Sequence, residues 1–368
     1  MEIYQNPLRG TGLASDVGMA RGVLRTLADP VRAMLSACPV HAATPLFDAT
    51  DLAADLAIAS LSIKDERERM GLGSFKALGG AYAVACAVKE QAEAALGRVV
   101  EPAELTSEAV KESVANLHVL CASAGNHGLS VAAGARVFGV KASVYLSDSV
   151  PEAFAERLRS VGATVVHAGT IYEESMAAAE LAAREEGLLI SDSTWPGYVD
   201  PALTVLEGYT VLAAETVEAM DTPPSHIFLQ AGVGGLAASM AATFRKAWSD
   251  GPTIVVVEPD AAPCLKAGVE AGAPVTAPGP VSSMGRLDCK DPSHVALESL
   301  AREADFFVTL SDPECEAAVA TVALQGLASS PSGAAGLAAL MTCDAEGRTK
   351  LGIGASSHVL TIMSEGAV

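Results

Sequence analysis

The chain has few aromatic and few basic residues. Aromatic side chains make up 4% of its 368 residues and hydrophobic ones 50%, so a buried core must be mainly aliphatic. Only 24 Lys and Arg face 44 Asp and Glu, which gives a formal net charge of −20 at pH 7. Because a surface of that sign repels phosphate backbones and anionic lipids, we expect neither nucleic acid nor a membrane as a partner.

Long hydrophobic runs and leader-like segments are missing too. The longest apolar candidate, Ala77–Val88, contains glycines and is followed by Lys89, so we expect no membrane-spanning helix. No basic segment followed by an apolar one occurs near the start, so no secretory signal is expected. The seven cysteines are scattered and form no C-x-x-C pair, which favours reduced thiols in a cytoplasm over a disulfide or zinc framework.

Signatures of other enzyme classes are also absent. The seven histidines show no H-E-x-x-H spacing, and no G-x-S-x-G motif occurs. We therefore expect neither a catalytic metal nor a serine hydrolase.

Short runs rich in β-branched residues alternate with longer alanine-rich stretches. The predicted strands are Leu117–Cys121, Ala142–Leu146, Thr164–His167, Ile227–Gln230, Thr253–Val257, Phe306–Leu310 and His358–Met363. The predicted helices include Phe154–Val161, Met176–Glu186, Ala237–Trp248 and Pro313–Leu327. Such alternation predicts an α/β fold, with parallel sheets covered by helices on both faces.

A single lysine stands out in Ser74-Phe75-Lys76-Ala77-Leu78-Gly79-Gly80. A helix start and hydrophobic surroundings both depress the pKa of an ammonium group, and an amine with a low pKa is suited to imine chemistry with an aldehyde. Taken alone, however, such a lysine is more often a solvent-exposed side chain lying along the surface.

Two loops that follow predicted strands are candidates for anion binding. In Cys121-Ala122-Ser123-Ala124-Gly125-Asn126-His127-Gly128, free backbone N–H groups are suited to a carboxylate, although a tight turn capped by Asn126 explains the pattern equally well. Gln230-Ala231-Gly232-Val233-Gly234-Gly235-Leu236 is suited to a phosphate, although glycine-rich turns are common in α/β proteins. It is neither a Walker motif nor a complete G-x-G-x-x-G.

Two further polar residues lie at strand ends. Asp192, in the segment Ser191–Tyr198, is a candidate general base or the cap of the following turn. Ser364 follows the last predicted strand, where a hydroxyl is able to bond a neutral ring nitrogen or simply begins the tail.

Together these segments resemble the fold type II pyridoxal-phosphate enzymes, the group of threonine dehydratase, serine racemase and cysteine synthase. The motifs occur in the family's order, starting from Thr44-Pro45-Leu46. Within the group the chain is most similar to the diaminopropionate ammonia-lyase family, from about Thr44 to the C-terminus. The segments that carry this likeness are Lys64–Glu66, Arg69–Leu72, Ser191–Tyr198, Leu206–Tyr209, Val257–Asp260, Ala262–Cys264, Ser283–Cys289 and Ser332–Leu337.

The resemblance implies two open, twisted, mostly parallel sheets with helices on both faces. It implies a large cofactor-binding domain formed by residues 1–80 and 200–368, and a smaller inserted α/β domain at 81–199. It also implies pyridoxal 5′-phosphate as cofactor, an amino acid as substrate and a homodimer as the assembly.

Site roles follow from the same resemblance. Lys76 matches the lysine that binds the cofactor covalently, and Asp192 matches the acid that removes the α-proton of the L-isomer. The other cofactor-binding candidates are Phe75, Asn126 (at the ring hydroxyl), Gly232, Val233, Gly234, Gly235 and Leu236 (at the phosphate), and Ser364 (at the ring nitrogen). The substrate-binding candidates are Ser74, Ser123, Ala124, Gly125 and His127.

One position departs from the family pattern. The ammonia-lyases have an aspartate before Gly125-Asn126-His127, associated with proton removal from the D-isomer, whereas this chain has Ala124, as the dehydratases do. An alanine neither accepts a proton nor pairs with a second substrate ammonium. The departure argues against use of the D-isomer and, less strongly, against diaminopropionate itself.

The leading hypothesis is an L-specific lyase that eliminates ammonia from 2,3-diaminopropionate or a related β-substituted amino acid, giving a 2-oxo acid. A hydroxyl at the ring nitrogen makes the ring a weak electron sink, which favours β-elimination over transamination. The alternatives are a dehydratase for serine, threonine or another β-hydroxy amino acid, a β-replacement synthase, and a catalytically silent metabolite binder.

Overall fold

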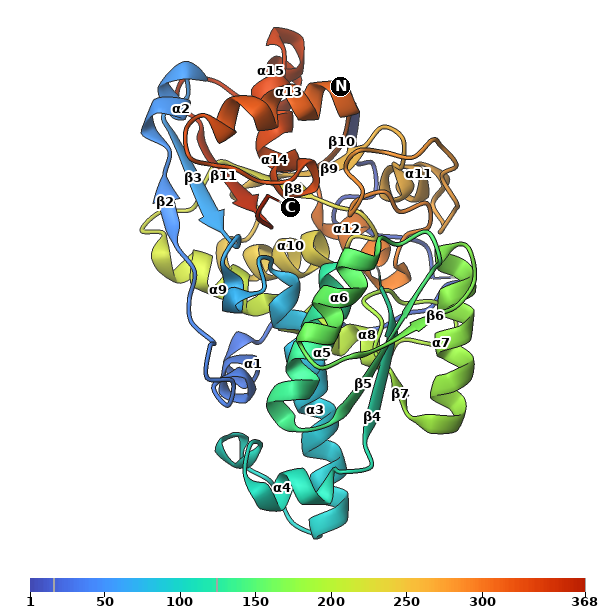
Figure 1. The fold of residues 1–368 in the computed structure, drawn as a ribbon. Helices are drawn as coiled ribbons and strands as arrows, with labels where there is room; N and C mark the ends of the chain where they lie inside the picture. The colour runs from blue at the N-terminus through green and yellow to red at the C-terminus, as the bar shows by residue number, and fades with distance from the viewer. Residues whose placement is uncertain (16, 124, 368) are drawn as a thin grey trace.

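The computed structural model describes residues 1–15, 17–123 and 125–367. Its strands form two separate sheets (Figure 1). The strands are β1 (Glu2–Gln5), β2 (Leu46–Asp48), β3 (Ser60–Asp65), β4 (His118–Ala122), β5 (Lys141–Leu146), β6 (Thr164–His167), β7 (Leu188–Leu189), β8 (His226–Gln230), β9 (Thr253–Pro259), β10 (Phe306–Leu310) and β11 (His358–Met363).

The two sheets are mostly parallel. The larger has the order β1-β10-β9-β8-β11-β3-β2 and is antiparallel at its two edge pairs within the described chain. The smaller has the order β6-β5-β4-β7, and its pairs are parallel. The predicted α/β fold with two open, mostly parallel sheets is therefore confirmed.

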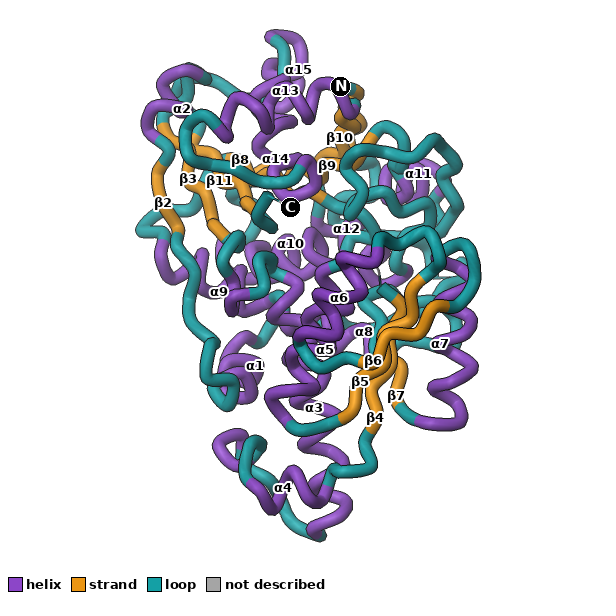
Figure 2. Tube along the Cα trace, in the orientation of Figure 1, coloured by secondary structure: helices purple, strands orange, loops and turns teal. Residues whose placement is uncertain are grey.

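Helices surround both sheets, as Figure 2 shows in purple. They are α1 (Ala28–Leu35), α2 (Thr50–Asp55), α3 (Lys76–Leu96), α4 (Glu108–Ser113), α5 (Asn126–Phe138), α6 (Glu152–Ser160), α7 (Tyr172–Glu186), α8 (Asp200–Gly208), α9 (Thr210–Ala219), α10 (Gly235–Trp248), α11 (Cys264–Ala271), α12 (His294–Glu303), α13 (Asp312–Ala323), α14 (Pro331–Thr342) and α15 (Ala345–Leu351). Two 3₁₀ turns lie at Arg69–Gly71 and Pro102–Glu104. No helix in the described ranges combines the length and apolarity needed to cross a bilayer.

The central strands are buried on both faces. In β8, Ile227 and Leu229 belong to the same apolar cluster as Leu236 of α10, whereas Phe228 between them packs with the cluster that contains α14. Successive side chains of a strand point to opposite faces, so this division means that helices cover both sides of the sheet. That double burial explains why the strand is a continuous apolar run in the sequence.

The predicted helices are present, but most of their ends shift by one to four residues. Helix α13 ends at Ala323, before the expected Leu327. Gly326 adopts φ +79°, and the Leu327 N–H donates to the Val322 carbonyl at 3.0 Å. A left-handed glycine with such a bond closes a helix, and it does so here before the predicted end.

Candidate active site

Lys76 and Asp192 form an ion pair between distant parts of the chain. Lys76 is the first residue of α3, and Asp192 lies shortly after β7. The Lys76 Nζ donates to Asp192 Oδ2, and the two side chains are 23% and 19% exposed. The structure therefore brings together the two residues that the sequence singled out for chemistry.

The expected low pKa of Lys76 is wrong for this structure. Burial acts to lower the pKa of the ammonium, but the neighbouring Asp192 charge outweighs it and raises the pKa above its usual value. Burial likewise acts to raise the pKa of Asp192, and the Lys76 charge outweighs it and holds that pKa below its usual range. Both residues were expected at the site, but no local pattern shows that their charges pair, since 116 positions separate them.

The Ser123–His127 loop joins β4 to α5. Gly125 is the residue before the helix, and its N–H donates to Ser123 Oγ at 3.2 Å. His127 is 4% exposed, and its Nε2 lies 2.9 Å from the Ile190 carbonyl. Burial lowers the pKa of this imidazole, which favours its neutral form. Backbone N–H groups at the start of this 13-residue helix suit a carboxylate; Ala124 lies outside the described residues.

Asn126 is tied to a carboxylate that the sequence analysis did not single out. Its Nδ2 donates to Glu365 Oε2 at 2.6 Å, and Glu365 is 4% exposed. Glu365 Oε1 accepts from Arg286 Nη1 at 2.7 Å and from Ser330 Oγ. Glu365 directly follows the candidate Ser364, and this adjacency is the feature of the sequence that could have marked it as a site residue.

The glycine-rich loop connects β8 to α10. Gly234 has φ +100°, in the left-handed region that favours glycine. A Cβ on Gly232 would lie 3.0 Å from Cys289 Sγ and 3.1 Å from Leu287 Cα, so a side chain there would be crowded. The loop leaves backbone N–H groups at the N-terminus of a 14-residue helix, which is suited to an anion such as phosphate.

Ser364 lies just beyond β11, and its hydroxyl is held by Gln230. The Gln230 Nε2 donates to Ser364 Oγ at 3.0 Å and faces the carbonyls of Gly333 and Ile362 at 2.8 and 3.0 Å. Because carbonyl oxygens only accept hydrogen bonds, these two orient the Gln230 amide with its nitrogen toward them. Because Ser364 Oγ accepts from this nitrogen, its own proton is left to donate to another acceptor. The Phe75 N–H donates to the Ser364 carbonyl at 3.0 Å, which joins this strand end to the lysine segment.

A polar cavity of about 490 Å³ adjoins these residues. It includes Asn126 and Glu365 in its wall, and Arg157 of α6 reaches it from the helices around the smaller sheet. The other charged side chains of the wall are Asp65, Arg67, Glu68 and Arg286. Such a lining is suited to a charged small molecule rather than an apolar one.

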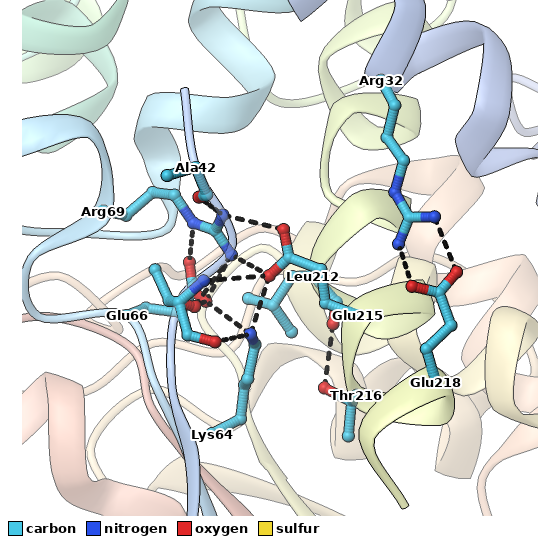
Figure 3. Close-up of polar contacts among 10 residues, drawn as sticks. Arg32, Ala42, Lys64, Glu66, Arg69, Leu212, Glu215, Thr216 and Glu218 are labelled. Atoms are coloured by element: carbon cyan, nitrogen blue, oxygen red, sulfur yellow. Dashed lines mark hydrogen bonds and ion pairs between the residues drawn. The ribbon is translucent and has the colours of Figure 1, made fainter. Parts of the chain in front are cut away.

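A buried ion cluster anchors the segment that leads to Lys76 (Figure 3). Arg69 is 0% exposed, and its guanidinium donates to Glu66 at 2.7 Å and to Glu215 of α9 at 2.6 Å. Lys64 of β3 donates to Glu215 at 2.7 Å and to the Thr44 carbonyl at 2.6 Å. The cluster thereby joins three parts of the chain: the segment before β2, the end of β3, and α9. Its member Arg69 lies only a few residues before Lys76.

Comparison with known proteins shows which family this chain belongs to. A family model described as pyridoxal-phosphate dependent enzyme matches residues 38–365. The chain belongs to the pyridoxal-phosphate dependent enzymes. Its cofactor is pyridoxal phosphate, and the predicted fold type II membership is confirmed.

Relatives of this pyridoxal-phosphate enzyme include ammonia-lyases and dehydratases. The diaminopropionate ammonia-lyase of Salmonella typhimurium is 32% identical over 352 residues, which cover 89% of this chain and 86% of the relative. A serine dehydratase-like protein of Mus musculus is 30% identical over 226 residues, 56% of this chain and 66% of the relative. The crystal structure of the Escherichia coli diaminopropionate ammonia-lyase in complex with D-serine matches with a TM-score of 0.86 at 25% identity, covering 99% and 93% of the two chains.

The side chains of this pyridoxal-phosphate enzyme fit its cofactor. An amine, a glycine-rich anion site and a hydroxyl able to donate are present at the ends of neighbouring elements. The buried polar atoms without a hydrogen-bond partner among the described residues include Ser74 Oγ, His127 Nδ1 and the Tyr209 hydroxyl. A polar ligand beside such an atom would supply a partner, because buried polar groups are nearly always hydrogen-bonded.

Proposed function

We propose that this enzyme is a lyase that eliminates ammonia from 2,3-diaminopropionate or a related β-substituted L-amino acid. With the diamino acid, one water molecule is consumed and the products are pyruvate and two ammonia molecules. The observation that carries the proposal is the pairing of Lys76 with Asp192 beside the Ser123–His127 loop. The ammonia-lyase relatives, which match nearly the whole chain, support it.

Lys76 and Asp192 handle the protons in this proposal. Bound pyridoxal phosphate supplies an aldehyde for the amines and a conjugated ring that takes up negative charge. Lys76 holds the cofactor, and Asp192 accepts the α-proton of the L-amino acid, with the freed Lys76 amine as the second candidate base. Once Lys76 no longer carries an ammonium charge, burial dominates and the pKa of Asp192 rises, which makes it a better base.

The remaining candidate residues bind and orient. The N–H groups of Ser123–His127 take the substrate carboxylate, with Ser74 as a further substrate contact. Gly232–Leu236 takes the cofactor phosphate, and Phe75 packs beside the ring. Asn126 takes the ring hydroxyl, with its amide oriented by Glu365. The Ser364 hydroxyl donates to an unprotonated ring nitrogen, which limits charge delocalisation and favours loss of the β-substituent.

A substrate panel tests the proposal. Purified holoenzyme is given the L- and D-isomers of diaminopropionate, serine and threonine, and both 2-oxo acid and ammonia are measured. We expect pyruvate from L-diaminopropionate with two ammonia molecules for each pyruvate, and no turnover by the matched Lys76→Ala variant. If the wild-type enzyme turned over only β-hydroxy amino acids, the proposal that ammonia is the β-leaving group would be contradicted. Robust turnover of D-diaminopropionate would contradict the proposed L-specificity.

A dehydratase for β-hydroxy amino acids is the second candidate. Two observations favour it: Ala124 replaces the acid of the ammonia-lyases, and a serine dehydratase-like relative covers just over half of this chain. In the same panel, this function predicts one ammonia for each 2-oxo acid and a higher kcat/KM for L-serine or L-threonine than for L-diaminopropionate.

Assembly, location and domain division are also proposed here. We propose a cytoplasmic homodimer, with residues 81–199 forming a domain inserted between 1–80 and 200–368. The seven cysteines are all free, in keeping with a reducing compartment. Light scattering tests the dimer, and fractionation of the native cell tests the location. Hydrogen–deuterium exchange tests whether residues 81–199 open as a unit separate from 1–80 and 200–368.

A further inference from the structure

Tyr209 carries a buried hydroxyl that the proposed chemistry leaves unused. The residue lies between α8 and α9 and is 1% exposed. Among the described residues, its hydroxyl has no hydrogen-bond partner. Burying such a group costs free energy unless a partner arrives, so an orphan hydroxyl indicates a ligand that binds beside it.

The ring of Tyr209 lies between the first turns of two long helices. A Cβ on Gly79 of α3 would lie 2.5 Å from Cε1 and 2.8 Å from Cζ of the ring, and a Cβ on Gly235 of α10 would lie 3.7 Å from Cε2. In a tyrosine ring, Cζ carries the hydroxyl, and Cε1 and Cε2 are the ring atoms on either side of it. The hydroxyl is therefore close to Gly235, the first residue of the helix that follows the glycine-rich loop.

Phe75 holds the ring in this position. The two rings meet edge to face, with centroids 4.9 Å apart and an interplanar angle of 65°. Phe75 directly precedes Lys76, so Tyr209 contacts the lysine segment and the start of the anion-binding helix at once. Burial raises the pKa of the Tyr209 hydroxyl, and the charges of Lys76 and Asp192 act on it as well.

The electrostatics determine which role the hydroxyl takes. The N-termini of α3 and α10 both make this region positive, so it favours an anion. A phenol beside a bound anion acts as a hydrogen-bond donor. We propose that the Tyr209 hydroxyl is a ligand of the cofactor phosphate bound at Gly232–Leu236, as the side-chain donor that completes the backbone site.

The proposal rests on the proposed cofactor site and is tested by comparing two ligands. Pyridoxal 5′-phosphate and pyridoxal, which lacks the phosphate, are titrated into cofactor-free wild-type protein and the Tyr209→Phe variant, with Kd read from absorbance or fluorescence. Loss of a hydrogen bond to a charged group should weaken the phosphorylated ligand about tenfold or more. Binding of pyridoxal should stay within about twofold of wild type, because it has no phosphate for the hydroxyl to bind.

The matched control is Tyr82→Phe, which removes another buried hydroxyl, one that bonds to Cys86 on the same helix. It should leave both affinities unchanged. The proposal is overturned if Tyr209→Phe leaves the affinity for pyridoxal phosphate unchanged, or if it weakens both ligands equally. A wild-type protein that binds neither ligand would instead overturn the proposed function, so the two failures are distinguishable.

Discussion

Removing the guanidinium at the centre of the buried ion cluster should destabilise the enzyme strongly. In Arg69→Met, Glu66 and Glu215 lose four ion-pair hydrogen bonds of 2.6–3.0 Å. The Ala42 carbonyl and Thr44 Oγ1 lose two more, of 2.7 and 2.9 Å. Of the two cations in the cluster, Lys64 alone would then remain to balance two buried carboxylates. Leaving one partner of a buried pair uncompensated costs about 3–5 kcal/mol.

This cost converts to a change in the unfolding temperature. At about 2.1 cal/mol/K per residue, the unfolding entropy of 368 residues is about 0.8 kcal/mol/K. A loss of about 3–5 kcal/mol therefore lowers Tm by about 4–6 °C. Thermal unfolding of variant and wild type at saturating cofactor, followed by circular dichroism, measures the difference.

The matched control makes the same substitution at an exposed ion pair. Arg98 bonds to Glu104 at 2.7 Å, but the side chains are 48% and 37% exposed, so Arg98→Met should shift Tm by about 1 °C or less. If Arg69→Met melted as close to wild type as Arg98→Met does, the buried cluster would not anchor this segment. The reasoning from burial and pairing would then be refuted.

Three further substitutions probe the site and its packing. Asp192→Asn should lower kcat by about 10²- to 10⁴-fold while cofactor stays bound, because an amide accepts no proton; a pyruvate assay with absorbance spectra measures both. Gly79→Ala should reduce stability by about 1–3 kcal/mol, because the new Cβ would lie 2.5 Å from Tyr209 Cε1; denaturant unfolding measures it. Glu365→Gln should weaken cofactor binding about tenfold, because the charged acceptor of a 2.6 Å bond from Asn126 becomes neutral; a cofactor titration measures it.

Each of these three predictions has a control variant or a result that would contradict it. Gly354→Ala places its Cβ in open space and should leave stability unchanged, and equal stability of the two alanine variants would contradict the packing argument. Glu68→Gln neutralises an exposed acid of the cavity wall, and an equal loss of cofactor there would show a general charge effect. If Asp192→Asn retained full turnover, the proposal that Asp192 accepts the α-proton would be contradicted.

Much of the fold is predictable because buried parallel strands leave continuous apolar runs. Strands β10 and β11 begin and end where the sequence predicted, and so does the partly exposed edge strand β6. Strand β3 was not predicted, because Lys64 and Asp65 interrupt its apolar pattern. Lys64 is tolerated at 1% exposure only because Glu215, distant in sequence, pairs with it. Such compensation is a tertiary property that no local pattern reveals.

The candidate site is predictable in its parts and not in its pairings. The Asn126 loop, the glycine-rich loop and Ser364 each follow a predicted strand, whereas Lys76 does not, and it was the resemblance to a known family that placed them in one site. The Glu365 carboxylate on Asn126 and the raised pKa of Lys76 depend on contacts across 239 and 116 positions. Tyr209 lay within a motif already noted, but only the packing between two helices shows its hydroxyl without a partner.

Chemical trapping of the cofactor tests the central claim most directly. Holoenzyme is reduced with borohydride and digested, and the peptide carrying the pyridoxyl group is sequenced by mass spectrometry. The account predicts the label on the ε-nitrogen of Lys76 and none on the Lys76→Ala variant. A label on any other lysine, or a protein that never takes up the cofactor, would contradict it.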